Sequence, residues 1–148
     1  MSKREWSVEV DRPADEVLAW WVDFAFQLPR LRGATLGIRK ASPGPTVLGS
    51  TFQQRVAVLG FESTMNARIS DWDPPYAATI SLEGGIARSG TIRLRIVPTA
   101  TGSRIVRTLE IEPQGIARLL WPILWPALIR RADVANRNIK RLIESEHP

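Results

Sequence analysis

The pattern of hydrophobic and polar residues near the N-terminus predicts one strand and then one helix. Residues 5–11 alternate between apolar and polar side chains, which is typical of a half-buried strand. Pro13, Asp15 and Glu16 follow, and a proline with acidic neighbours is typical of the first turn of a helix. Residues 17–24 give that helix an apolar side. The chain therefore begins with a strand that leads into a helix.

After a second short helical piece or loop over residues 24–31, the pattern returns to a period of two. Turns rich in glycine and proline separate the alternating segments at hairpin spacing. Sequential strands joined by short turns imply an antiparallel sheet, one face of which must be buried. The predicted strands cover residues 36–38, 49–58, 61–72, 76–82, 91–97 and 104–112.

Residues 115–146 show no alternation, and their apolar residues recur at steps of three and four, which predicts a helix about 45 Å long. Proline inside a helix costs about 3 kcal/mol. The regular helix is therefore expected to begin near Pro122 or Pro126, after a kink or a short helical turn. One long helix and seven strands predict a sheet curved around a helix.

Length and composition indicate a single domain over residues 1–148, with 44% hydrophobic residues. The chain has no cysteine, which excludes disulfides and thiolate chemistry, and the N-terminus shows no signal peptide. The longest apolar run, residues 119–129, is too short to span a membrane, so a cytoplasmic location is expected. The net charge of +5 could favour nucleic acid or an anionic membrane surface as a partner. A solvated basic surface is the favoured interpretation, so nucleic acid is not expected as a partner.

Catalytic and metal-binding signatures are absent from the sequence. The single histidine, His147, lies at the extreme C-terminus, and no P-loop, zinc-binding, nucleophile-elbow or dinucleotide motif occurs. Asp71, Asp73 and Tyr76 could act as acid/base groups, although capping of the adjacent Pro-Pro turn is the favoured interpretation. We therefore expect no catalytic residues, no cofactor and no metal.

Four segments in this order resemble the START-like or SRPBCC superfamily, especially its polyketide cyclase/dehydrase and lipid-transport branch. They are residues 10–24, 69–85, 101–113 and 119–144. The resemblance implies an α+β helix-grip fold, in which a seven-stranded curved antiparallel sheet wraps around a long C-terminal helix. It also implies two short helices after the first strand. The family includes carriers and enzymes, so the fold does not fix the function.

In the resembled fold, the inner face of the sheet and the helix enclose a ligand chamber lined mainly by apolar side chains. For each apolar candidate, plain core packing is the alternative. The expected ligand-binding residues are Trp20, Phe24, Phe52, Gln54, Met65, Tyr76, Ile80, Ile92, Leu94, Leu124, Leu128 and Ala135.

Two polar side chains share a strand face with apolar residues. Gln54 alternates with apolar neighbours, and Arg107 does so in the last strand. A polar group that points inward must find a hydrogen-bond partner or a ligand. The alternatives are that Gln54 reaches water at a strand end and that Arg107 lies in a strand whose two faces are both mixed.

Trp121-Pro122 and Trp125-Pro126 give the start of the helix an apolar surface nearly all round, flanked by arginines. This segment could be a lid over the cavity, a homodimer contact, or a transient membrane contact through Trp121 and Trp125.

The sequence favours binding or transport of a small hydrophobic molecule, such as a lipid, an isoprenoid or a polyketide-like aromatic. A polyketide cyclase or aromatase is the alternative, because such an enzyme needs few strong acids or bases. A basic interaction protein that acts on RNA or on an anionic membrane surface is a third hypothesis.

Overall fold

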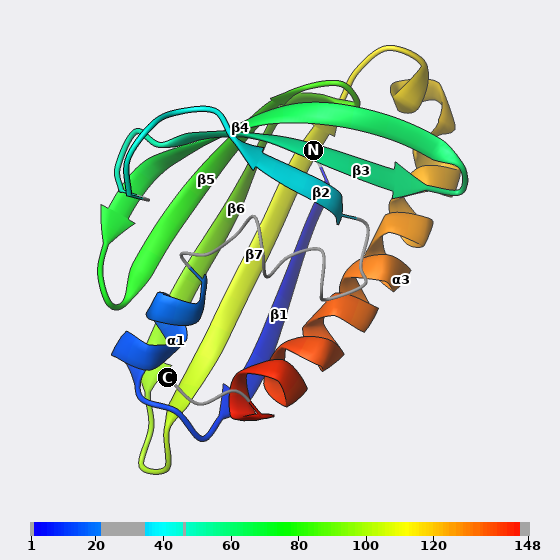
Figure 1. Ribbon diagram of the computed structural model, residues 1–148. Coiled ribbons are helices and arrows are strands. Elements are labelled where there is room, and N and C mark those ends of the chain that lie inside the picture. The colour runs from blue at the N-terminus through cyan, green and yellow to red at the C-terminus, as the bar shows by residue number, and fades with distance from the viewer. Residues whose placement is uncertain (1, 22–34, 46, 146–148) are drawn as a thin grey trace.

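The computed structural model describes residues 2–21, 35–45 and 47–145, which form a curved antiparallel sheet and a long helix across it (Figure 1). The sheet has the strand order β1-β7-β6-β5-β4-β3-β2, so every strand pairs with its neighbour in sequence except β1, which pairs with β7. This arrangement confirms the predicted α+β helix-grip fold. The second short helix was expected over residues that lie outside the described part of the chain.

The elements follow the hydrophobic pattern closely, and the strands extend one to four residues beyond most predicted ends. The helices are α1 (Ala14–Trp21) and α3 (Ile116–Ser145). The strands are β1 (Ser2–Val10), β2 (Thr35–Lys40), β3 (Thr51–Val58), β4 (Phe61–Asp73), β5 (Ala77–Gly84), β6 (Ala87–Pro98) and β7 (Ser103–Pro113).

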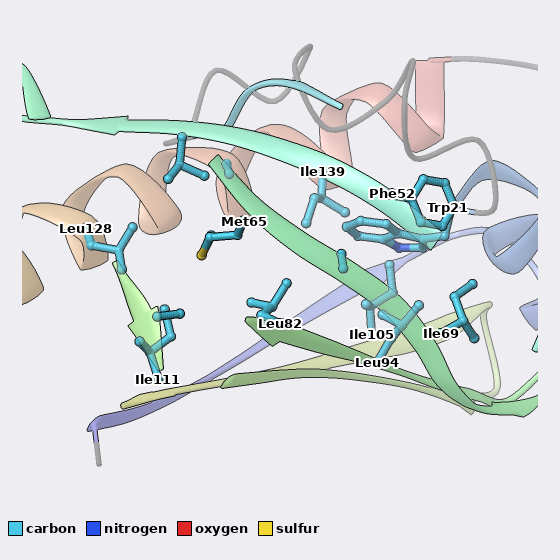
Figure 2. Close-up of a cluster of buried hydrophobic side chains, with 14 of the residues drawn as sticks. Trp21, Phe52, Met65, Ile69, Leu82, Leu94, Ile105, Ile111, Leu128 and Ile139 are labelled. Carbon is cyan, nitrogen blue, oxygen red and sulfur yellow. The ribbon is translucent and has the colours of Figure 1, made fainter. Parts of the chain in front are cut away.

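The hydrophobic core lies between the concave face of the sheet, α1 and α3. Alternate residues of each strand point into it, as the period of two requires. Figure 2 shows Trp21 of α1 beside Phe52 of β3, with Ile105 of β7 and Ile139 of α3 in the same cluster. One face of the sheet is thus buried by two helices that lie at opposite ends of the sequence.

The prediction that the regular helix starts near one of the prolines is wrong, because α3 begins at Ile116 and continues through Pro122 and Pro126. Each proline lacks the N–H that would bond four residues back, so the carbonyls of Arg118 and Pro122 lose an intrahelical partner. Both prolines are exposed, so water can solvate these carbonyls. The outward position of the prolines therefore lets the helix tolerate both of them.

Hydrogen bonds join α3 to the edge strand β1. Near the N-terminal ends of the two elements, Nε1 of Trp121 donates to Oγ of Ser2 at 2.8 Å. Farther along, Nε1 of Trp6 donates to Oδ1 of Asp133 at 2.6 Å. Each bond also satisfies a partly buried indole N–H, which would otherwise lose its water partner without replacement.

The same pairing continues at the C-terminal ends. Nζ of Lys140 donates to the carbonyl of Glu9 at 3.2 Å, and the backbone N–H of Asp11 donates to Oε2 of Glu144 at 3.0 Å. Nη2 of Arg12 donates to the carbonyl of Glu144 at 2.8 Å. The contact therefore extends beyond the end of β1.

These bonds show that α3 runs beside β1 in the same direction, as Figure 1 also shows. The strand advances about 30 Å from residue 2 to residue 11, and the helix advances about 35 Å from residue 121 to residue 144. Because the two lengths nearly match, residues of β1 and α3 can bond to each other from one end of the contact to the other. The helix is held along one edge of the sheet.

The acidic end of this contact predicts a pH effect. The hydrogen bond from Lys140 holds the pKa of Glu144 below its usual range, and the backbone N–H of Asp11 adds to the effect. A carboxylate with a lowered pKa stabilises the fold above its unfolded pKa, and that stability is lost as the pH falls through the folded pKa. Glu144→Gln should therefore lower the melting temperature at pH 7 and have less effect at pH 3. Thermal unfolding across this range checks the expectation, and an equal effect at both values would contradict it.

The β3–β4 hairpin carries a second testable feature. Leu59 and Gly60 form its turn with φ values of 53° and 78°, a left-handed pair typical of two-residue hairpins. A β-carbon makes this conformation unfavourable for leucine by about 1–2 kcal/mol, and asparagine tolerates it better.

Leu59→Asn should therefore stabilise the protein by about 0.5–1 kcal/mol, measured by urea unfolding. Leu48→Asn is the control, since Leu48 is similarly exposed but does not have a positive φ. If both variants gained stability equally, the effect would come from reduced surface hydrophobicity and not from the turn.

Candidate ligand-binding site

A cavity of about 80 Å³ lies between the inner face of the sheet and the middle of α3. Most of its wall is apolar, and the polar side chains in it come from β2, β3 and β7. The residues that line it are Thr35, Gln54, Val56, Met65, Leu82, Ile86, Ile92, Arg107, Leu109, Ile111, Leu128, Ala132 and Ala135.

Strand register builds the floor of the cavity. Ile92 of β6 lies opposite Leu109 of β7, and in the next inward-facing row Leu94 lies opposite Arg107. On the other side of β7, Arg107 lies opposite Trp6 of β1. Cross-strand neighbours on one face are within contact distance. Arg107 is therefore placed between an aliphatic and an aromatic side chain in an otherwise apolar floor.

The roof comes from α3, where Leu128, Ala132 and Ala135 recur at steps of four and three and so share one side of the helix. Figure 2 shows Leu128 on α3 near Ile111 of the sheet, with Met65 close by. The two alanines fill little of the space below the helix. The cavity lies where these small residues face the sheet.

Gln54 is buried, with 7% of its surface exposed, and its Nε2 donates to Oγ1 of Thr35 at 2.8 Å. The side chain therefore does not reach water at a strand end, which was one interpretation of the sequence. A buried amide needs such a partner to offset its lost hydration. Thr35 fixes the orientation of the amide at the cavity wall.

Arg107 has an unusual environment for a charged side chain. Its Nη1 atom is enclosed and has no hydrogen-bond partner, and no ion pair to Arg107 occurs within the described residues. The guanidinium lies 5.3 Å from the ring centre of Trp21 and 5.8 Å from that of Trp6. The charge thus faces aromatic rings and the cavity, and no carboxylate of residues 2–21, 35–45 or 47–145 pairs with it.

Burial lowers the pKa of Arg107 from its usual value to about 10. This displacement corresponds to about 3 kcal/mol by which the enclosed site disfavours the charged form. Each cation–π contact stabilises the charged form by about 0.5–2 kcal/mol, so the two indoles offset part of the cost of burying the charge. Since the pKa stays far above 7, Arg107 remains a cation at neutral pH.

Some of the candidates from the sequence meet at this cavity. The wall contains Gln54, Met65, Ile92, Leu128 and Ala135. Leu124 lines a smaller adjoining space of about 10 Å³.

The other described candidates lie elsewhere. Phe52 and Leu94 are buried in the core, while Trp20 and Ile80 are half-buried and pack against it. Tyr76 is 49% exposed at the turn before β5 and does not line the cavity. Phe24 lies outside the described residues. The role of the whole set in ligand binding stays a prediction.

Several wall residues are not among the candidates that the sequence predicts. Arg107 was recognised as sharing a face with apolar residues, and its alternation was the available signal. Val56, Leu82 and Ile111 also fit the alternating pattern, but nothing in that pattern distinguishes a wall residue from a core residue. The remaining omissions are Thr35, Ile86, Leu109 and Ala132.

The acidic residues near the Pro-Pro turn are exposed and lie outside the cavity wall. Oδ1 of Asp71 accepts a bond from the N–H of Trp72, and the carbonyl of Asp73 accepts one from the N–H of Tyr76. The bond to the Asp73 carbonyl closes the turn through the backbone, and the Asp71 side chain bonds within β4, so capping of the turn by these side chains stays a prediction. Across residues 2–21, 35–45 and 47–145, no cluster of potential metal ligands occurs. Among the described helices, none is long and apolar enough to cross a membrane.

The Trp-Pro segment packs inward through its tryptophans. Trp121 and Trp125 are half-buried, and their rings lie 5.5 Å apart at 30°. The apolar residues that reach solvent on these turns are instead Ile116, Leu119, Leu120 and Ile123. Any contact with a partner would therefore involve these aliphatic side chains first.

Comparisons with solved structures agree with the fold described above. The fold matches an aromatase/cyclase called Zhui from Streptomyces sp. R1128, with a TM-score of 0.78, 16% identity, and coverage of 97% of this chain and 93% of that one. It also matches a protein from Thermus thermophilus called TTHA0849, with a TM-score of 0.80, 12% identity, and coverage of 97% and 98%.

A third match is the major latex-like protein 151 of Panax ginseng, with a TM-score of 0.70, 11% identity, and coverage of 95% and 96%. No curated protein matches the sequence. The family model described as polyketide cyclase / dehydrase and lipid transport matches residues 1–144. The chain therefore belongs to the polyketide cyclase/dehydrase and lipid transport family, within the SRPBCC superfamily.

Proposed function

We propose that this protein binds a small hydrophobic molecule in the cavity between the sheet and α3. The observation that carries the proposal is an apolar wall with two enclosed polar side chains, Gln54 and Arg107. Apolar walls with a few polar groups are typical of ligand sites. The family, whose description includes lipid transport, supports the same role.

The size of the cavity limits how a ligand enters. Its volume of about 80 Å³ is smaller than the roughly 150 Å³ that accommodates a single benzene ring in an apolar protein cavity. A ring-sized ligand therefore requires the walls to move. Met65 is the most adaptable wall residue, since its unbranched thioether can change rotamer at low cost.

Burial of the ligand supplies the affinity. An aromatic body that buries about 200 Å² gains roughly 5 kcal/mol, while association costs at least about 4 kcal/mol. The net gain is small, so polar contacts at the wall would decide which molecules bind well.

A cyclase reaction is the alternative, and the similarity in fold to the Zhui aromatase/cyclase favours it. No carboxylate or histidine is among the described residues that line the cavity. A reaction there would therefore depend on how the site folds and positions its substrate. Binding is the simpler proposal for this wall.

Filling the cavity tests the proposal. Ala135→Leu places a larger side chain in the roof, so it should weaken binding of the neutral fluorescent probe N-phenyl-1-naphthylamine by at least about tenfold, or about 1.4 kcal/mol. Ala19→Leu, at an exposed position of α1, is the matched control and should bind like the wild type. Absence of probe binding to the wild type, or equal binding to all three proteins, would contradict the proposal.

We also propose that the start of α3 docks on an anionic lipid surface from which the ligand is taken. Ile116, Leu119, Leu120 and Ile123 are spaced by three, one and three residues, so they share one side of the helix. Their exposed fractions are 62%, 81%, 37% and 62%. An apolar stripe on the solvent side is unusual for a helix whose other side already packs on a core.

Charge favours a lipid surface as the occupant. Arg130 lies two turns beyond Ile123 on the same side of α3. The acidic residues of the helix, Asp133 and Glu144, already bond to Trp6 and Lys140. Basic residues near an anionic membrane contribute about 1 kcal/mol each. The exposed basic residues of α3 are Arg118, Arg130, Arg131, Arg137, Lys140 and Arg141.

Sedimentation with lipid vesicles tests this docking. The wild type should bind phosphatidylglycerol vesicles at low salt and phosphatidylcholine vesicles much less, and a Leu119→Ser/Ile123→Ser variant should lose most of the binding. Val47→Ser/Leu48→Ser removes exposed apolar side chains elsewhere and should not. If the wild type fails to bind, or if it is a dimer that only the first variant dissociates, the docking proposal is wrong.

A further inference from the structure

We infer that the ligand of this cavity carries a carboxylate, which pairs with Arg107 while the apolar body of the ligand lies below α3. The inference rests on the proposed function, because it names the class of molecule that the same cavity binds. Its evidence is a separate feature of the wall, namely a buried cation that has no anionic partner in the described part of the protein.

Arg107 is half-buried on the inner face of the sheet, and its Nη1 atom is fully enclosed. Its neighbours across the sheet are Leu94 and Trp6, and the ring of Trp21 lies on the guanidinium at 5.3 Å. Arginine on the outer face of the same region behaves differently. Arg104 is exposed and pairs with Glu9 at 3.0 Å. The same strand therefore carries a neutralised arginine outside and an unneutralised one inside.

Nη1 of Arg107 is a hydrogen-bond donor that has no acceptor among the described residues. It is fully enclosed and has no hydrogen-bond partner, although it belongs to a group that lines the cavity. Buried donors without partners are rare in folded proteins, and each one requires an explanation. The ring faces of Trp6 and Trp21 attract the positive charge but supply no oxygen acceptor. A ligand oxygen in the cavity would complete the site.

The charge and shape of the guanidinium favour a carboxylate. Its planar set of N–H groups matches the two oxygens of a carboxylate, and charge-assisted bonds of this kind are stronger than neutral ones. A single cation balances a single negative charge, whereas a phosphate dianion would leave excess charge in an apolar cavity. The other polar wall groups, Gln54 and Thr35, already bond to each other. The structure thus offers one site for one monoanion.

Apolar residues define the rest of the ligand. Ile92 and Leu109 form the row of the floor next to Arg107, and Leu128 and Ala132 cover the cavity from the helix. A flat or short apolar body bearing one carboxylate fits this distribution. Such a molecule would bury its body by the hydrophobic effect and its charge by pairing with Arg107.

A pair of isosteric ligands tests the inference by calorimetry at pH 7. The wild type should bind 2-naphthoate at least about tenfold more tightly than the neutral 2-naphthamide. Arg107→Met should lose at least about tenfold in naphthoate affinity and keep naphthamide affinity within about threefold. Arg107→Lys should retain part of the preference for naphthoate, because it keeps the charge but loses the planar geometry. Arg95→Met, at an exposed position of β6, is the control and should match the wild type.

A ligand-free measurement separates this role from a structural one. Removal of an unpaired buried charge should raise the melting temperature of Arg107→Met above that of the wild type. If Arg107 served only to hold Trp6 and Trp21, the same variant would melt at a lower temperature than the wild type. The variant and the wild type would then bind naphthoate with similar affinity. That result would overturn the inference.

The remaining outcomes separate the two proposals. Equal affinity of the wild type for naphthoate and naphthamide would overturn the carboxylate inference and leave the hydrophobic site intact. Failure of both naphthalene ligands and of N-phenyl-1-naphthylamine to bind the wild type would overturn the proposed function itself, and the inference with it.

Discussion

The hydrogen bonds between β1 and α3 determine where the helix lies and therefore whether a cavity exists. Hydrophobic burial alone is non-directional and would favour the closest packing of the helix on the centre of the sheet. Bonds from Trp6 to Asp133 and from Trp121 to Ser2 instead hold α3 along the edge strand. Because the contact continues to Glu144, the helix is held at both ends. The middle of α3 can then cover the cavity from this edge without filling the space beneath the helix.

Small residues at the middle of α3 leave space between the helix and the sheet. Ala132 and Ala135 face the sheet where larger aliphatic side chains would have closed the gap, while Ile139 beyond them is fully buried. On the sheet, Arg107 is a charged group at a position where packing alone would favour an aliphatic residue. Such a conflict between a residue and its packing environment, in a fold whose other residues suit their positions, is expected at functional sites.

The sequence was sufficient to predict the fold because an antiparallel sheet with one buried face shows its alternation directly. All seven strands follow from that pattern. The start of α3 could not be predicted in the same way. The low helix propensity of proline is a local property, and it placed the start of the helix at Pro122 or Pro126. The outward position of Pro122 and Pro126, which lets water satisfy the freed carbonyls, is a property of the folded structure.

The cavity was harder to predict than the fold. Alternation tells which face a residue is on, but not where along the face the helix leaves a gap. Phe52 and Gln54 share one face of β3, yet Phe52 lies in the core and Gln54 at the cavity wall. Arg107 shared its pattern with core residues too. Whether it had a partner depended on its neighbours in β1 and β6, and those follow only from the strand register.

The central claim is that α3 and the sheet enclose a site in which Arg107 binds the anionic group of a ligand. A crystal structure of the protein with bound 2-naphthoate tests it most directly. A carboxylate oxygen should lie about 2.7–2.9 Å from Nη1 of Arg107, with the naphthalene rings between Ile92 and Leu128. A carboxylate that points away from Arg107, or an Arg107 that pairs with a carboxylate of the protein while the ligand lies elsewhere, would contradict it.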